Sequence, residues 1–162
     1  MNDASDGAEP ADADVTGDGS ADELVEVVRA QGHENVTAEH VSTLEFTSDD
    51  FLTPAGDCIL AIEADRVPAD FSDAFLDACQ AHGATITATI EADGHTHEVT
   101  GRGHPDFSFE NERSHVIRTS DYVDDRTVMV GADGAAADVD RNLVAALADG
   151  ADATLTLRVD PA

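Results

Sequence analysis

Two stretches of this chain match each other in the same order along most of its 162 residues. The pair Gly32-His33 recurs as Gly103-His104, an offset of 71 residues (104 minus 33). Further pairs follow with small gaps: Thr47-Ser48-Asp49 and Thr119-Ser120-Asp121, Ala64-Asp65 and Ala132-Asp133, Ala69-Asp70 and Ala137-Asp138, and Ala84-Thr85-Ile86-Thr87 and Ala153-Thr154-Leu155-Thr156. Because the matches keep their order, we predict an internal repeat of residues 22–93 and 94–160, within one domain at 21–162.

Each copy is predicted to contain a strand, a Gly-His loop, two strands, a helix and a last strand. In the first copy the strands are expected near 24–29, 41–47, 58–62 and 86–90, and in the last of these apolar residues alternate with threonines. The helix is expected between Ser72, a plausible N-cap, and Gly83. Eight strands and two helices predict a β-rich α+β fold, with two β-β-β-α-β units forming a pseudo-twofold twisted sheet or partly closed barrel flanked by the two helices.

The charge of the chain indicates where such a fold would be stable. Asp and Glu number 35 against 8 basic residues, all of them arginine, for a formal net charge of -27. At molar salt the Debye length is about 3 Å, so the repulsion is largely screened. We therefore predict a halophilic protein that loses its fold on dialysis to low salt. Residues 1–20 are predicted to be a disordered acidic leader.

Several functional classes are disfavoured by the sequence. No apolar run approaches the roughly 18 residues of a membrane span, and no basic-then-apolar signal opens the chain, so a cytoplasmic protein is expected. Aromatic residues make up 4% of the chain, and with the acidic charge they disfavour non-specific nucleic-acid binding. The phosphate-binding and nucleophile motifs of common enzymes are missing. A homo-oligomer is compatible with these features.

Four strings together resemble an uncharacterised archaeal family, catalogued as domain of unknown function 371: GHENVTAEH, LTPAGDCI, GRGHP and RTVMVGADGAAADVDRNLV. The resemblance covers residues 24–159. It implies a cytoplasmic archaeal protein and brings no activity. The family often carries lysine after the Ala-Asp of the second copy, where this chain has Gly134. That departure puts a role for a base at this point in doubt.

The Gly-His loops are the first candidate site. If the two loops meet, His33 and His104 can share a divalent metal or a substrate proton, with His40 as a third ligand from the first copy only. The alternative is that each histidine holds its own turn through a backbone hydrogen bond, and we favour it.

Residues present in one copy only are the second source of candidates. Asp57 could act as a base and Cys58 as a nucleophile, although a turn aspartate and a small buried cysteine are the commoner roles. Arg102 adjoins the second Gly-His loop, and Arg118 and Arg126 are expected at facing ends of consecutive strands. These three arginines could hold a phosphate or carboxylate through bidentate contacts, or could pair with the chain's own carboxylates.

Three hypotheses therefore remain open at this stage. The leading one is a protein that binds a small anionic ligand near the Gly-His loops. The second is a metal-dependent, hydrolase-like enzyme that uses the loop histidines with Asp57. The third is a structural or interaction subunit.

Overall fold

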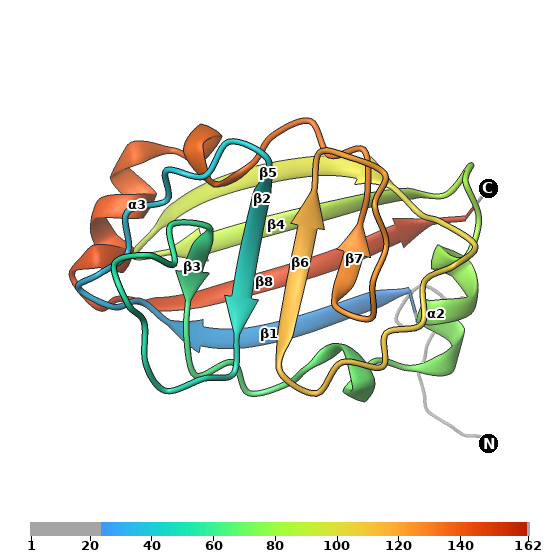
Figure 1. Cartoon of the computed structure of the whole chain (residues 1–162), viewed down its shortest axis with the longest axis horizontal. Coiled ribbons are helices and arrows are strands. Elements are labelled where there is room, and N and C mark those ends of the chain that lie inside the picture. The colour runs from blue at the N-terminus through green and yellow to red at the C-terminus, as the bar shows by residue number, and fades with distance from the viewer. Residues whose placement is uncertain (1–23, 162) are drawn as a thin grey trace, which may run out of the picture.

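Two four-stranded sheets face each other in the computed structural model, which describes residues 24–161 (Figure 1). The predicted leader at 1–20 lies outside these residues. One sheet, here the long-strand sheet, has the order β1 (Val25–Gln31), β8 (Asp152–Asp160), β4 (Thr85–Ala92) and β5 (His95–Arg102). The other, the short-strand sheet, has the order β3 (Ile59–Ala61), β2 (Thr43–Thr47), β6 (Ser114–Arg118) and β7 (Thr127–Met129).

Two helices close opposite ends of the space between the sheets (Figure 1). Helix α2 (Asp73–Cys79) begins after Ser72, whose hydroxyl accepts a hydrogen bond from the Phe75 amide at 3.1 Å. Helix α3 (Arg141–Ala148) begins after Asp140, whose carboxylate accepts from the amides of the second and third helical residues. A short 3₁₀ turn precedes each helix, η1 (Pro68–Asp70) and η2 (Ala136–Asp138). Capping of this kind satisfies amides that have no partner inside the helix.

The same order of elements occurs in the two halves of the described chain. Exchanging β1 with β5, β4 with β8, β2 with β6 and β3 with β7 returns the same neighbours in both sheets. The predicted α+β, strand-rich class with two helices is therefore confirmed, as two sheets and not as a closed barrel. The origin of this symmetry by duplication stays a prediction.

The edges of the two sheets are joined at two seams. Isolated bridges link Gln31 of β1 to Ile62 and Arg102 of β5 to Val130. Beside them, the carboxylates of Asp65 and Asp133 accept the backbone N–H groups of the edge strands, at 2.9 Å and 3.0 Å. Unpaired strand edges invite aggregation. Asp65 and Asp133 therefore occupy backbone N–H groups of the edge strands that another strand could otherwise bind.

The core lies between the sheets and under the helices. Inward residues of β4 and β8, such as Ile86, Ile90, Leu155 and Leu157, are fully buried, while the threonines between them face outward. This alternation follows from the two-residue period of a strand. Within residues 24–161, no helix is both long enough and apolar enough to cross a membrane.

Candidate functional site

The two Gly-His loops lie at opposite ends of the molecule. The first follows β1 and packs on α3, since a Cβ at Gly32 would overlap the carbonyl group of Leu147. The second follows β5 and packs on α2, where a Cβ at Gly103 would overlap the carbonyl oxygen of Cys79. Figure 1 shows α3 and α2 at the two ends of the sheets. The glycines thus allow the loops to touch two different helices.

Each histidine of these loops holds its own turn. Nδ1 of His33 accepts the backbone N–H of Asn35 at 3.0 Å, and Nδ1 of His104 accepts that of Asp106 at 3.0 Å. A ring nitrogen that accepts a hydrogen bond from an amide in this way stabilises the turn and is not free to bind a metal ion. The alternative of a structural role for both histidines is therefore the one that the geometry supports.

His40 has a structural counterpart in the second half. Its Nδ1 accepts the backbone N–H groups of Ser42 and Thr43, at 3.2 and 3.1 Å. In the second half, Oδ1 of Asn111 accepts the equivalent amides of Arg113 and Ser114. An amide oxygen and a ring nitrogen thus perform the same task at equivalent positions.

The structure does not bring together His33, His40 and His104, the residues of the predicted metal site. The twofold relation of the halves separates the Gly-His loops instead of bringing them together. Within residues 24–161, no group of three or more histidine, cysteine, aspartate or glutamate residues is placed to hold a metal ion. The structure therefore gives no support to a metal-dependent enzyme that uses these histidines.

Cys58 has the environment of a protonated thiol. Its Sγ lies 3.5 Å from Oε1 of Glu45. Burial, together with the charge and hydrogen bond of Glu45, raises the pKa of Cys58 to about 11. A nucleophilic cysteine needs a lowered pKa. Asp57 contributes its backbone carbonyl to the turn, accepting the amides of Glu39 and His40. The structure thus gives Cys58 no activating partner, and Asp57 a backbone role in the turn.

Arg118 is the most constrained polar side chain among the predicted site residues. Only 9% of the residue is exposed. Its Nε donates to Oγ1 of Thr127 at 2.9 Å, and its Nη2 donates to Oδ2 of Asp124 at 2.9 Å. The guanidinium carbon lies 4.9 Å from the ring centre of Tyr122. Nη1, the third nitrogen, makes no hydrogen bond to any residue that the structure describes.

Arg126 joins Arg118 at the same carboxylate. Its Nη2 lies 3.2 Å from Oδ2 of Asp124, so two guanidinium groups share one carboxylate oxygen. Burial by itself would raise the pKa of Asp124, but hydrogen bonds from Arg126 and the charge of Arg118 outweigh it, and the pKa lies below its usual value. Two positive charges therefore face one negative charge.

Arg102, the third predicted arginine, is not part of this cluster. Its guanidinium lies over Gly131 at the seam between β5 and β7. The predicted three-arginine site is thus corrected to a pair, Arg118 and Arg126. The sequence placed Arg102 with them because it adjoins the Gly-His loop, but its guanidinium lies against Gly131 and makes no contact with Asp124 among the described residues.

Arg118 and Cys58 share one face of the molecule, and Arg126 adjoins this face through Asp124. Thr43 of β2 is the register partner of Arg118 on β6, and both lie on the face of the short-strand sheet that points away from the core. Glu45 lies two residues further along β2 on the same face, beside Cys58. We call this the outer polar face: Thr43, Glu45, Cys58, Arg118 and Thr127.

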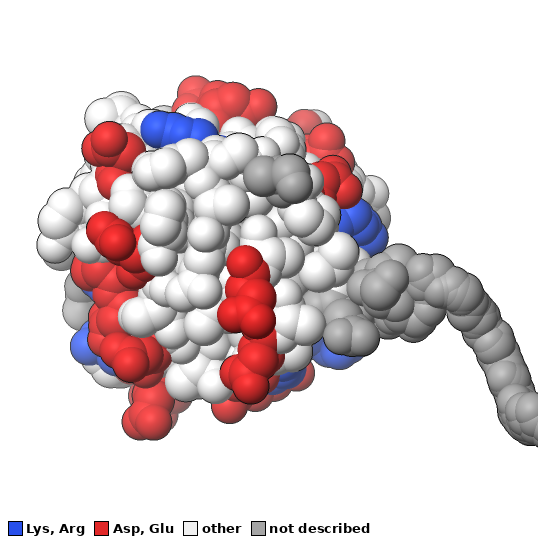
Figure 2. Space-filling model, turned by 90° about the vertical axis from the view of Figure 1, so that its right-hand side faces the viewer, with Lys and Arg blue, Asp and Glu red and all other residues white. Residues whose placement is uncertain are grey.

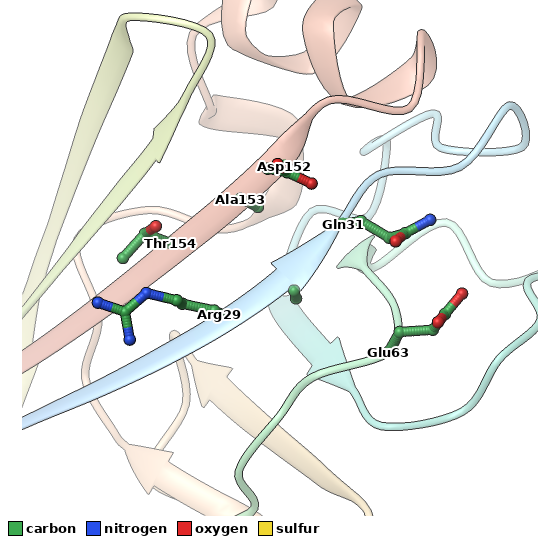
Figure 3. Close-up of a pocket in the computed structure, with 7 residues that line it drawn as sticks. Arg29, Gln31, Glu63, Asp152, Ala153 and Thr154 are labelled. Carbon is green, nitrogen blue, oxygen red and sulfur yellow. The ribbon is translucent and has the colours of Figure 1, made fainter.

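A second feature was missed by sequence reasoning. An open pocket of about 450 Å³ lies at the seam between β1 and the end of β3 (Figure 3). Arg29, Glu63 and Asp152 are among its lining residues. A position-by-position comparison of the two copies could have indicated this pocket, because its three charged residues have uncharged counterparts in the other copy.

An α+β protein with two twofold-related halves and sheets joined at two seams is the class that these observations define. The chain belongs to the family described as Domain of unknown function (DUF371), whose sequence profile matches residues 28–160. It is similar to an uncharacterised protein of Methanocaldococcus jannaschii, with 39% identity over 124 residues, which cover 76% of this chain and 91% of that protein. The predicted resemblance to the family is thereby confirmed.

Proposed function

We propose that this protein binds a small anionic ligand on its outer polar face, with Arg118 as the principal contact and Arg126 as the second. The observation that carries the proposal is the state of Arg118, a nearly buried guanidinium fixed by Thr127 and Asp124 with Nη1 still available. A guanidinium held in this way has little conformational entropy left to lose on binding.

The two guanidinium groups are the features of this face that favour an anion. Arg118 and Arg126 supply two positive charges, against one negative charge on Asp124 between them and one on Glu45 of the same face, in a chain whose formal net charge is -27. Figure 2 shows that acidic side chains spread over the end of the molecule that carries α2, with the basic ones near its margin. An anion approaching such a surface needs a fixed local cation, and arginine binds carboxylate and phosphate oxygens through paired N–H donors.

Tyr122 supports the same placement. Its ring lies against Arg118 and is 60% exposed, which makes it one of three exposed large apolar side chains among residues 24–161. Stacking on an aromatic ring favours a guanidinium that stays in one orientation. The ring thus covers one side of Arg118 and leaves the remaining N–H groups to a ligand.

Titration of the protein with inorganic phosphate and with malonate tests this proposal. Calorimetry is carried out in potassium chloride of fixed molar concentration, because the acidic chain is expected to need salt. We expect Arg118→Ala to weaken binding at least ten-fold, Arg118→Lys to weaken it less because lysine lacks the planar fork, and Arg126→Ala to weaken it least.

Arg158→Ala is the matched control, because Arg158 is an exposed arginine on β8 of the other sheet. It removes the same charge from the chain and is expected to leave binding unchanged. Equal loss of affinity in the Arg118 and Arg158 variants would reduce the effect to net charge and overturn the proposal. So would the absence of binding by either anion to the unmodified protein.

A further inference from the structure

The seam between β1 and the end of β3 contains the pocket drawn in Figure 3. Its lining comes from three segments that are distant in sequence: residues 29–31 of β1, residues 152–154 of β8, and Glu63, which follows β3. The pocket volume of about 450 Å³ lies in the range of small-molecule sites. The side chains around it are mainly polar, with Arg29, Glu63 and Asp152 charged.

The other seam provides an internal comparison for this pocket. The bridges Gln31–Ile62 and Arg102–Val130 are equivalent, so Glu63 corresponds to Gly131. By the same symmetry, residues 29–31 correspond to Thr100, Gly101 and Arg102. Residues 152–154 correspond to Thr85, Ile86 and Thr87, because Gln31 pairs with Asp152 and Arg102 pairs with Thr85. In that seam the guanidinium of Arg102 lies over Gly131. In the second seam the counterparts of Arg29, Glu63 and Asp152 are therefore uncharged, and the Arg102 side chain lies against Gly131.

The backbone conformation at Glu63 does not require a glutamate. Glu63 has φ of 56° and Gly131 has φ of 58°, so both residues have the left-handed conformation that favours glycine. Their amides also make equivalent hydrogen bonds, to the carbonyl oxygens of Asp49 and Ser120. A glutamate in this conformation is strained, and strain of this kind concentrates at functional sites. Glycine would satisfy the backbone better, so the backbone conformation does not account for a glutamate at this position.

The charges of the pocket define the ligand that would complement it. Arg29 supplies one positive charge, and Glu63 and Asp152 supply two negative charges. In Figure 3, Arg29 extends beside Thr154, while Gln31 and Glu63 lie on the other side of the view. The opposite charges are thus separated along the pocket. A ligand with one carboxylate and two ammonium groups would match both the signs and the separation.

We propose that this seam pocket binds a small zwitterion of the diamino-acid type, with Arg29 contacting its carboxylate and Glu63 and Asp152 contacting its ammonium groups. The pocket is independent of the arginine pair on the outer polar face, because none of its lining residues belongs to that face. It is a second binding site of the same chain, with a ligand of different charge.

Two probes separate the contributions of the two ends of the pocket. L-lysine carries one carboxylate and two ammonium groups, and 1,5-diaminopentane carries the two ammonium groups alone. Titration of each into the full chain is followed by the chemical shifts of backbone amides in molar potassium chloride. We expect L-lysine to shift the amides of β1 and β8 around the pocket and to bind at least ten-fold more tightly than the diamine.

Three variants test the assigned contacts. Glu63→Gly is expected to weaken both probes about ten-fold, and its fold is protected because Gly131 shows that glycine is accepted at this backbone position. Arg29→Gln is expected to weaken L-lysine and to spare the diamine. Glu98→Gln removes one charge from β5, outside the pocket, and is expected to change neither.

The outcomes separate this proposal from that of the anion site. Arg118→Ala is expected to leave L-lysine binding intact, so a failure at the outer polar face does not touch the seam pocket. Equal weakening by Glu63→Gly and Glu98→Gln would reduce the effect to net charge and overturn the assignment. Absence of L-lysine binding to the unmodified chain, or shifts confined to residues outside the pocket, would also overturn it.

Discussion

The two halves of this protein have the same polar groups where the backbone needs them and different ones where the surface is open. Three pairs of side chains accept equivalent backbone amides in both halves: His33 and His104, Asp65 and Asp133, and Asp70 and Asp138. Each pair satisfies an amide that a turn, an edge or a 3₁₀ segment leaves without a partner. Residues common to both halves therefore report the fold.

The positions that differ between the halves carry the candidate chemistry. Arg118 stands where the first half has Thr47, and Glu63 stands where the second half has Gly131. In the interior, His115 stands where the first half has Leu44. Because the backbone is the same on both sides, its hydrogen bonds do not require these three differences. Two kinds of substitution test this distinction. One changes a residue that both halves share, and the other makes the halves identical at a position where they differ.

The largest effect is expected at the shared glycines. Gly32→Ala and Gly103→Ala would each push a methyl group into a helix backbone carbonyl, and neither neighbour is a flexible side chain. We expect each substitution to lower the free energy of unfolding by about 4 kcal/mol, in the upper range of single substitutions. Chemical denaturation at fixed molar salt measures the change.

Gly134→Ala is the control for these two substitutions. The nearest atom to a Cβ at Gly134 is 3.4 Å away, an ordinary contact, and the expected change is within about 0.5 kcal/mol. Gly-His loops built for ligand binding and not for packing would tolerate alanine at Gly32 or Gly103. A change there no larger than that of Gly134→Ala would contradict the structural role.

Much of the fold could be predicted because the repeat and the apolar periodicity act locally. Alternation in Ile86, Ala88 and Ile90, and the Ser72 cap, predicted the elements that the structure contains. The repeat shows which residues are equivalent, but equivalence does not say whether equivalent loops meet. Here the antiparallel pairing of β4 with β8 places the two Gly-His loops at opposite ends, so the histidines of the predicted joint site do not meet.

The candidate sites were predictable only in part. Arg118 and Arg126 were found because basic residues are rare in this chain. Their partner Asp124 was not, since it is one acidic residue among 35 Asp and Glu. Glu63 escaped for a different reason. Glycine usually marks a left-handed backbone position in a sequence, and at this seam a glutamate takes its place.

His115→Leu makes the two halves equal in the core and is expected to have the second largest effect, at acidic pH. His115 is 1% exposed, stacks on Phe71 with ring centres 5.5 Å apart, and leaves Nε2 without a partner among the described residues. Burial lowers the pKa of His115 from 6.5 to about 4, the nearby charge of Arg66 adds to the lowering, and a hydrogen bond to the Phe46 carbonyl opposes it.

The sign of the pH effect follows from these values. The folded pKa lies below the unfolded one, so the unfolded chain takes up this proton first as the pH falls. The unmodified protein therefore loses stability between about pH 6.5 and pH 4, by about 3 kcal/mol at 1.36 kcal/mol per pKa unit. The leucine variant should lack this share of the loss. Parallel stability curves for the two proteins across this pH range would contradict the assignment.

The smallest change in stability is expected at Glu63 and Gly131, the equivalent positions of the two seams. It distinguishes a carboxylate that stabilises the fold from one that serves binding. Glu63→Gly relieves a left-handed non-glycine residue, and we expect it to raise the free energy of unfolding by about 1 kcal/mol. Gly131→Ala is the reciprocal change at φ of 58°, and it is expected to lower that free energy by at least as much, because Arg102 also lies over this position. Denaturation at fixed salt measures both. A Glu63→Gly variant less stable than the unmodified chain would show that the carboxylate serves the fold, and the two seams would then differ for structural and not for functional reasons.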